Sequence, residues 1–178
     1  MVEPLLHFAV PFASLRAVGV DLRKVTFASL VALTPDLDAL FQVHRSQSHS
    51  VIVLALVAFP LLILTRNRKT LRSFVLLGAF GVLVHLVLDL FQAPTPVLWP
   101  LVSQSLWIQA TVNFHMGSAP VITGSAALQT EPTAFEHFTS FDAPVLTAPG
   151  LGVSIVLMAL PLVQILRNRL SVPSVSQP

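Results

Sequence analysis

The chain has 178 residues, of which 54% are hydrophobic and only 10% are charged. An average soluble domain carries about 25% charged residues, so ten basic and eight acidic side chains are too few to cover a water-soluble globule of this length. This composition excludes a disordered chain, a nucleic-acid-binding module and most soluble enzymes, and it favours an integral membrane protein. The absence of cysteine also excludes disulfides, thiol catalysis and zinc sites built from cysteine.

Five apolar segments predict helices along the chain. The first two, Val2–Leu15 and Val25–Leu33, are shorter than a standard span. They either cross the membrane with distortion, dip into it, or lie on its surface as amphipathic helices. Three further segments are predicted spans: Ser46–Thr65, Leu71–Leu90 and Leu151–Leu166. At about 1.5 Å per residue, roughly twenty helical residues cross a hydrocarbon core of about 30 Å.

Basic residues lie in short clusters between these segments, as the positive-inside rule predicts for a multi-pass membrane protein. The clusters are Arg16–Lys24, Arg66–Arg72 and Arg167–Arg169. If they face the cytoplasm, Arg45 is the one basic residue outside, and Asp21 is the one acidic residue inside.

The segment 92–149 lies on the outer side in this topology and is rich in Pro, Thr, Ser and Gly. Parts of it, Leu106–Phe114 and Ala119–Leu128, have a β-like composition, so we expect either a small structured cap or a mobile linker. The predicted fold class is an all-α polytopic membrane protein with about five helices and a small β-like extracytoplasmic cap loop. The predicted division is a four-helix membrane region (1–91), the cap (92–149), a C-terminal transmembrane helix (150–170) and a disordered tail (171–178).

Ionisable side chains gather at the predicted outer end of the helices. His85 and Asp89 are four residues apart, so they share one face of an apolar helix, where an Asp is costly and usually functional. Asp36 and Asp38 follow the helix-breaking Pro35, and an extended turn would direct both carboxylates toward one cation. The alternatives are an interfacial His–Asp hydrogen bond for the first pair, and a helix cap with a solvated carboxylate for the second.

Three more histidines belong to the same predicted face: His7, His44 and His49. Each on its own is also compatible with a structural role. The spacing of His44 and His49 requires a bend between them, and Ser48 is the expected N-cap of a helix that begins at His49. Imidazoles and carboxylates in these numbers suit Zn²⁺, Mn²⁺ or Fe²⁺, either as two ions or as one ion with outer carboxylates that orient the imidazoles. The predicted metal ligands are His7, Asp36, Asp38, His44, His49, His85 and Asp89.

Arg45 stands between two of these histidines, and a guanidinium matches a phosphate with two parallel hydrogen bonds. An ion pair with Asp36 or Asp38 is an equally good interpretation. His115 and His137 lie in the predicted cap, where a solvated position is expected, although His137 could reach the site from above.

Three motifs, together with Trp99-Pro100, resemble those of the membrane-bound metal-dependent hydrolases: Pro35-Asp36-x-Asp38, His44-Arg45-x-x-Ser48-His49-Ser50 and His85-x-x-x-Asp89. That family includes the inner-membrane hydrolase regulated by the LexA repressor, and the resemblance covers about His7 to Pro100. Its His and Asp usage is similar to that of zinc-dependent phospholipases C, which implies phosphoester hydrolysis. Ser46-Gln47-Ser48 departs from the family's frequent Gly-x-Thr, and Ala93–Pro96 stands where a glycine is common.

The leading expectation is therefore hydrolysis of a phosphoester in a lipid or lipid-linked substrate, at the extracytoplasmic face of the cell's inner membrane. One or two divalent ions, zinc or else manganese or iron, would activate water, with Asp36 or Asp38 as ligand or general base and Arg45 stabilising the developing phosphate charge. The main alternative is a non-catalytic, metal-stabilised scaffold that binds a partner through the outer loop. An ion or proton transporter is less favoured, because the ionisable groups gather at one face and no repeat is visible.

Overall fold

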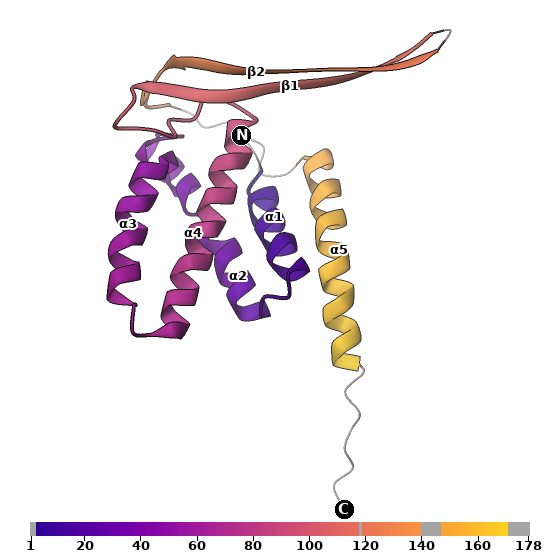
Figure 1. Ribbon diagram of the computed structural model, residues 1–178. Coiled ribbons are helices and arrows are strands. Elements are labelled where there is room, and N and C mark those ends of the chain that lie inside the picture. The colour runs from indigo at the N-terminus through magenta and orange to yellow at the C-terminus, as the bar shows by residue number, and fades with distance from the viewer. Residues whose placement is uncertain (1–2, 118, 140–146, 171–178) are drawn as a thin grey trace, which may run out of the picture.

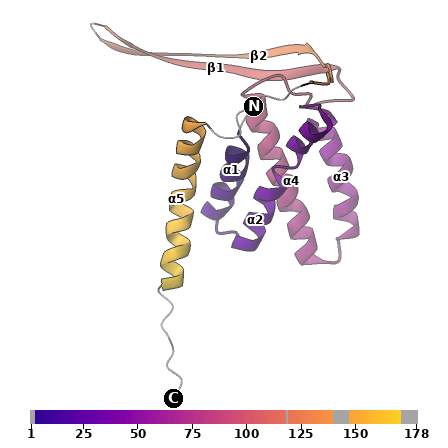
Figure 2. The ribbon, with the colours of Figure 1, turned by 180° about the vertical axis from the view of Figure 1, so that it is seen from behind.

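The computed structural model describes residues 3–117, 119–139 and 147–170. Its described parts contain five α-helices, two short 3-10 helices and one β-hairpin. The helices stand side by side and the hairpin lies across one end of them (Figures 1 and 2). The elements are α1 (Pro4–Ala17), α2 (Leu22–Val31), η1 (Pro35–Phe41), η2 (Gln47–His49), α3 (Val51–Leu64), α4 (Lys69–Leu90), β1 (Gln104–Met116), β2 (Pro120–Pro132) and α5 (Ala148–Leu170).

Helix α4 is central, because α1, α2 and α3 all pack against it, while α5 packs on α1. The buried core between α1 and α2 consists of Phe12, Leu15, Val25 and Ala28. A Cβ added at Gly81 of α4 would overlap the backbone carbonyl of Ala28, so the glycine lets α2 and α4 approach closely. This contact holds η1, the segment after α2, beside the C-terminal half of α4.

The N-terminus of α5 is fastened to α1 by Glu3. The Glu3 side chain is buried and accepts a hydrogen bond from the Thr147 hydroxyl. A Cβ on Gly150 would overlap this carboxylate, so a larger residue there would displace the Glu3 side chain. A negative charge at this end of a helix also complements its dipole.

The two strands pair antiparallel along their whole length, from Gln104 opposite Pro132 to Met116 opposite Pro120. Because side chains alternate between the faces of a strand, this register gathers apolar residues on one face and polar residues on the other. The apolar face carries Leu106, Ile108, Ala110, Val112, Phe114, Met116, Ile122, Ala126 and Leu128. The base of the hairpin is joined to the preceding loop by a bridge between Thr95 and Leu106 and by ring contact between Trp99 and Phe135.

The all-α prediction is wrong, because two strands of 13 residues each form a long hairpin rather than a small cap. The alternation of apolar and polar residues runs through both strands, and it extends each of them beyond the segment that composition alone marked. The predicted number of membrane spans is also wrong, because most of the helices are too short. Among the described residues, only Lys69–Leu90 and Ala148–Leu166 are long and apolar enough to cross a membrane. Helix α3 has only 14 residues, because Ser46–Ser50 form η2 and its cap instead of helix.

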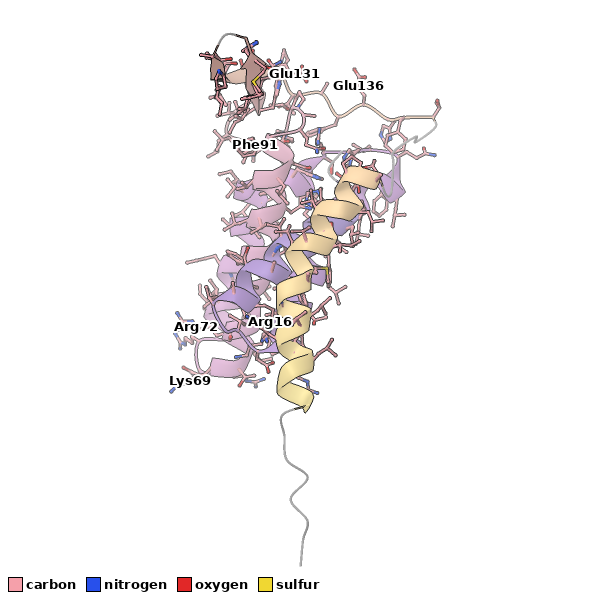
Figure 3. The ribbon with its side chains drawn as sticks, turned by 90° about the vertical axis from the view of Figure 1, so that its right-hand side faces the viewer. Arg16, Lys69, Arg72, Phe91, Glu131 and Glu136 are labelled. Atoms are coloured by element: carbon pink, nitrogen blue, oxygen red, sulfur yellow. The ribbon has the colours of Figure 1, made fainter. Side chains whose placement is uncertain are left out.

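Charge is segregated along the bundle. Arg16, Lys69 and Arg72 lie near one end of the helices, whereas Glu131 and Glu136 lie at the other end, beyond Phe91 (Figure 3). The hairpin and the polar residues described next are at the acidic end. The predicted tail, 171–178, falls outside the described residues.

Candidate metal centre

All seven predicted ligands converge at the hairpin end of the bundle, and four structural elements supply them. His7 lies one turn into α1, which begins with Pro4 at its first position. Helix η1 supplies Asp36 and Asp38, the η1–η2 loop with η2 supplies His44 and His49, and the last two turns of α4 supply His85 and Asp89.

One group consists of His7, Asp36, His85 and Asp89, whose ligand atoms all lie within 4.8 Å of one another. His7 Nε2 is 3.5 Å from Asp89 Oδ1, and His85 Nε2 is 3.6 Å from both Asp36 Oδ1 and Asp89 Oδ2. The His7 and His85 rings stack with their centroids 3.8 Å apart. Both histidines and Asp89 are fully buried, so the group is shielded from solvent.

A second group consists of Asp36, His44 and His49, so Asp36 belongs to both groups. His49 joins the two groups further, because its Nε2 lies 3.2 Å from Asp89 Oδ2 and 3.2 Å from His85 Nε2. Metal–ligand distances of about 2.0–2.2 Å allow the ligand atoms of one ion to be up to about 4.4 Å apart. The centre therefore has the dimensions of one ion or of two ions that share Asp36.

Asp38 lies outside both groups and contacts the histidines from behind. Its Oδ1 is 3.4 Å from His44 Nδ1 and its Oδ2 is 3.3 Å from His49 Nδ1. Oδ2 also accepts hydrogen bonds from the backbone N–H of Ser46 and the hydroxyl of Ser48. A carboxylate that holds one ring nitrogen directs the other nitrogen to a metal, which is the usual outer-shell arrangement.

The extended turn expected for Pro35–Asp38 is instead the start of a 3-10 helix. At three residues per turn, side chains two positions apart point in different directions, which explains why Asp36 and Asp38 separate. Likewise, the cap of the following helix is Ser50 rather than Ser48, since Ser50 Oγ accepts from the backbone N–H groups of Ile52 and Val53.

Asp38 and His49 lie outside the candidate spans, and this network shifts the pKa of each. Burial alone would raise the pKa of Asp38, but hydrogen bonds from His44, His49 and the Ser46 backbone outweigh burial and lower it. Burial alone would lower the pKa of His49, but its close contacts with three carboxylates, Asp36 foremost, raise it to about 10. In the metal-free protein His49 thus carries a proton that balances part of the negative charge.

Arg45 directs its guanidinium at Asp89, with Nε 3.5 Å from Oδ2 and Nη2 3.4 Å from Oδ1. The ion pair that the sequence suggested with Asp36 or Asp38 is thus made with Asp89 instead. Arg45 also has a positive φ of 55°, a conformation that is uncommon for a residue with a side chain.

The donor set fits a divalent cation. Several buried polar atoms of the centre make no hydrogen bond to any described residue: both ring nitrogens of His7, both carboxylate oxygens of Asp36 and Nδ1 of His85. Leaving such groups unpaired costs about 1–3 kcal/mol each, more when they are charged. A cation in the centre would satisfy those that face the other ligands, namely His7 Nε2 and the Asp36 oxygens. Imidazole and carboxylate together suit zinc, manganese or iron.

Sequence reasoning missed part of the surroundings of the centre. Ser48 was expected to cap a helix, but it contacts Asp38 and His49. His137 was expected in solvent, with an approach to the site from above as the alternative; it is exposed, yet it bridges to Val43 beside a cavity of about 320 Å³ that Asp38 helps to line. His115, in contrast, lies near the tip of the hairpin and is exposed.

The described residues thus combine two helices that are long and apolar enough to cross a membrane with a His–Asp cluster that could hold a metal ion. A family model described as YdjM inner membrane protein matches residues 2–168, nearly the whole chain. The protein therefore belongs to the YdjM inner membrane protein family, as the resemblance of its motifs to an inner-membrane family indicated in part. No curated protein and no solved structure matches the chain significantly.

Proposed function

We propose that this inner membrane protein is a metal-dependent hydrolase that acts on a phosphoester of a lipid or lipid-linked substrate. The observation that carries the proposal is the largely buried cluster of four histidines and two carboxylates, in which Asp36 belongs to both ligand groups. A divalent metal bound there, zinc or else manganese or iron, would polarise a phosphoryl oxygen and activate water near neutral pH.

The two carboxylates of η1 take different roles in this proposal. Asp36 has both oxygens within the centre and without a hydrogen bond to any described residue, so it is the ligand or general base. Asp38 already accepts from Ser46 and Ser48 and contacts two imidazoles, so it positions His44 and His49. This division develops the sequence-based expectation that either carboxylate fills either role.

Arg45 is the group best suited to a phosphate. Its guanidinium is next to the centre and pairs loosely with Asp89, at 3.4–3.5 Å. It can hold the phosphate with two parallel N–H groups and stabilise the charge that develops on its oxygens.

The proposed site faces the extracytoplasmic side. Basic residues favour the cytoplasmic side of a membrane, and Arg16, Lys69 and Arg72 lie at the end of the bundle opposite the centre (Figure 3). The hairpin and the segment 133–139 then lie outside, over the centre.

A phosphoester panel tests this proposal. Purified protein is assayed with stoichiometric metal on phospholipids, nucleotides and pyrophosphate, beside the same protein with Asp36→Ala. Turnover on a phosphoester that is lost with Asp36→Ala is the expected result. Stoichiometric metal without turnover on any substrate contradicts the proposal.

A further inference from the structure

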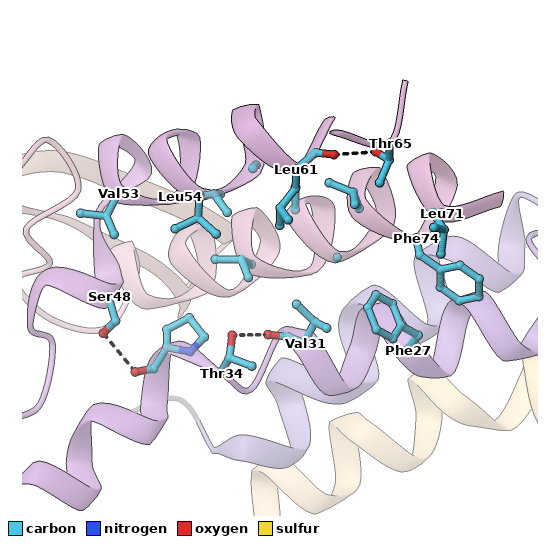
Figure 4. Close-up of a pocket in the computed structure, with 17 residues that line it drawn as sticks. Phe27, Val31, Thr34, Ser48, Val53, Leu54, Leu61, Thr65, Leu71 and Phe74 are labelled. Atoms are coloured by element: carbon cyan, nitrogen blue, oxygen red, sulfur yellow. Dashed lines mark hydrogen bonds between the residues drawn. The ribbon is translucent and has the colours of Figure 1, made fainter. Parts of the chain in front are cut away.

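A groove of about 600 Å³ lies between α3 and α4, beside α2 (Figure 4). One end is formed by Pro35 and Ser48, next to the metal centre, and the other by Thr65 and Leu71. Along α4, its lining extends from Leu71 to Val82, which is about 16 Å at 1.5 Å per residue. The groove is thus long, and its volume is within the range of about 300–1,000 Å³ for small-molecule sites.

The lining is apolar apart from the hydroxyl groups of Thr34, Ser48 and Thr65. No ionisable side chain is among its residues, and its hydroxyl groups already have partners. Thr34 and Thr65 donate to the backbone carbonyls of Val31 and Leu61, at 2.7 and 2.6 Å (Figure 4). Among the described residues that line the groove, each hydroxyl group already donates to a partner, so the groove is suited to a hydrocarbon chain.

The end at Ser48 connects the groove to the centre. Ser48 Oγ lines the groove and also lies 3.0 Å from Asp38 Oδ2 and 3.1 Å from His49 Nδ1. Pro35, which lines the same end, directly precedes Asp36. A molecule with its chain in the groove therefore has its polar end at the candidate ligands.

We propose that the groove between α3 and α4 holds one apolar chain of a lipid phosphoester whose phosphate lies at the metal centre. This inference rests on the proposed function for the role of the phosphate. It adds that the chain is a recognised part of the substrate, so that long-chain phosphoesters are favoured over soluble ones with the same headgroup.

Two alanines of α3 provide a matched pair of variants. Ala58 lines the groove, whereas Ala55, one turn earlier, is exposed and outside it. Ala58→Phe fills the groove, and Ala55→Phe adds the same side chain to the outer surface of the helix. Ala79→Phe fills the groove from α4 and provides a second variant if the first fails to fold.

The probe is a long-chain alkyl phosphonate with a photoreactive diazirine near the chain end, added to the metal-loaded protein in lipid vesicles. We expect labelling of groove residues such as Val57, Leu61 and Val75. Each displaced methylene is worth about fourfold in binding, so Ala58→Phe lowers this labelling by about tenfold or more, and Ala55→Phe leaves it unchanged. Equal labelling in both variants, or labelling centred on the outward Leu56 and Phe59, overturns the inference.

The phosphonate is not hydrolysed, so its binding is separate from catalysis. Metal content and turnover of long-chain and short-chain phosphoesters are measured on the same samples. Groove labelling that depends on position 58, without turnover of any phosphoester, supports chain binding in the groove and contradicts the proposed function. Turnover with no preference for long chains and no effect of Ala58→Phe supports the proposed function and overturns the inference that the groove binds the chain.

Discussion

His49 and His85 approach each other through their Nε2 atoms, which lie 3.2 Å apart although 36 positions separate the residues in the chain. Both nitrogens are also 3.6 Å from the same oxygen, Asp36 Oδ1. Two lone pairs at this distance repel each other unless a proton or a metal ion lies between them. This contact between η2 and α4 joins the two ligand groups, together with Asp36, which belongs to both.

The different positions of Asp36 and Asp38 predict different effects on metal binding. Asp36 belongs to both ligand groups, so Asp36→Ala should abolish binding. Asp38 contacts His44 and His49 through their Nδ1 atoms, so Asp38→Asn should weaken affinity by about 10–100-fold and keep the stoichiometry at saturating metal. Competition titration against a metal indicator measures both. An Asp38→Asn protein that stays metal-free at saturation would show that Asp38 is itself a ligand.

Metal affinity should rise with pH. His49 is protonated in the metal-free protein because its carboxylate contacts outweigh burial and raise its pKa from 6.5 to about 10. The metal must displace that proton, so affinity rises by about tenfold per pH unit between about pH 7 and about pH 9. Calorimetry in buffers of different ionisation enthalpy counts the protons released. Binding without proton release would contradict the assigned protonation of His49.

The same pKa shifts set the pH dependence of stability in the metal-free protein. The stabilisation of the folded state by protonated His49 is fully present below the unfolded pKa of 6.5. It is lost as the pH rises toward about 10. The lowered pKa of Asp38 acts in the opposite direction, since its contribution is present above the unfolded value of 3.8 and is lost at lower pH.

Arg45→Lys should separate catalysis from metal binding. A lysine keeps the charge but has no planar pair of N–H groups to match a phosphate. We expect kcat on a phosphoester to fall by about 10²-fold while metal content is unchanged. Parallel elemental analysis and steady-state kinetics measure the two quantities. Loss of metal together with activity would instead make Arg45 a residue that positions Asp89.

Two helical glycines give a matched test of the packing between α2 and α4. A Cβ at Gly81 would overlap the Ala28 carbonyl, whereas a Cβ at Gly152 of α5 meets nothing within 4 Å. Gly81→Ala should destabilise the protein by about 1–3 kcal/mol, and Gly152→Ala should be neutral or slightly stabilising. Thermal unfolding in detergent compares them. Equal melting temperatures would contradict the close approach of α2 to α4.

The sequence predicted which ionisable side chains gather at one end of the bundle better than it predicted the fold. An isolated His85 and Asp89 on an apolar helix are conspicuous, because a carboxylate there is too costly to keep without a function. The roles within the set could not be predicted, since the separation of Asp36 from Asp38 depends on η1 being a 3-10 helix. Nothing in a single sequence marks that local choice.

The hairpin shows the opposite difficulty. Its apolar face depends on the pairing register, for example Ile108 opposite Leu128, and pairing between strands is a long-range property. Composition found both strand segments but not their length or their partnership. The short α3 was missed for a similar reason, because the residues before Val51 are used by the centre rather than by the helix.

Metal content tests the central claim most directly. Protein purified in mild detergent is analysed for zinc, manganese and iron as wild type, as His85→Ala/Asp89→Ala, and as His115→Ala, a control on the exposed hairpin. One or two equivalents in the wild type and the control, lost in a folded double variant, is the predicted result. No bound metal in the wild type, even after reconstitution with each ion, would contradict the account and make the cluster a buried hydrogen-bond network.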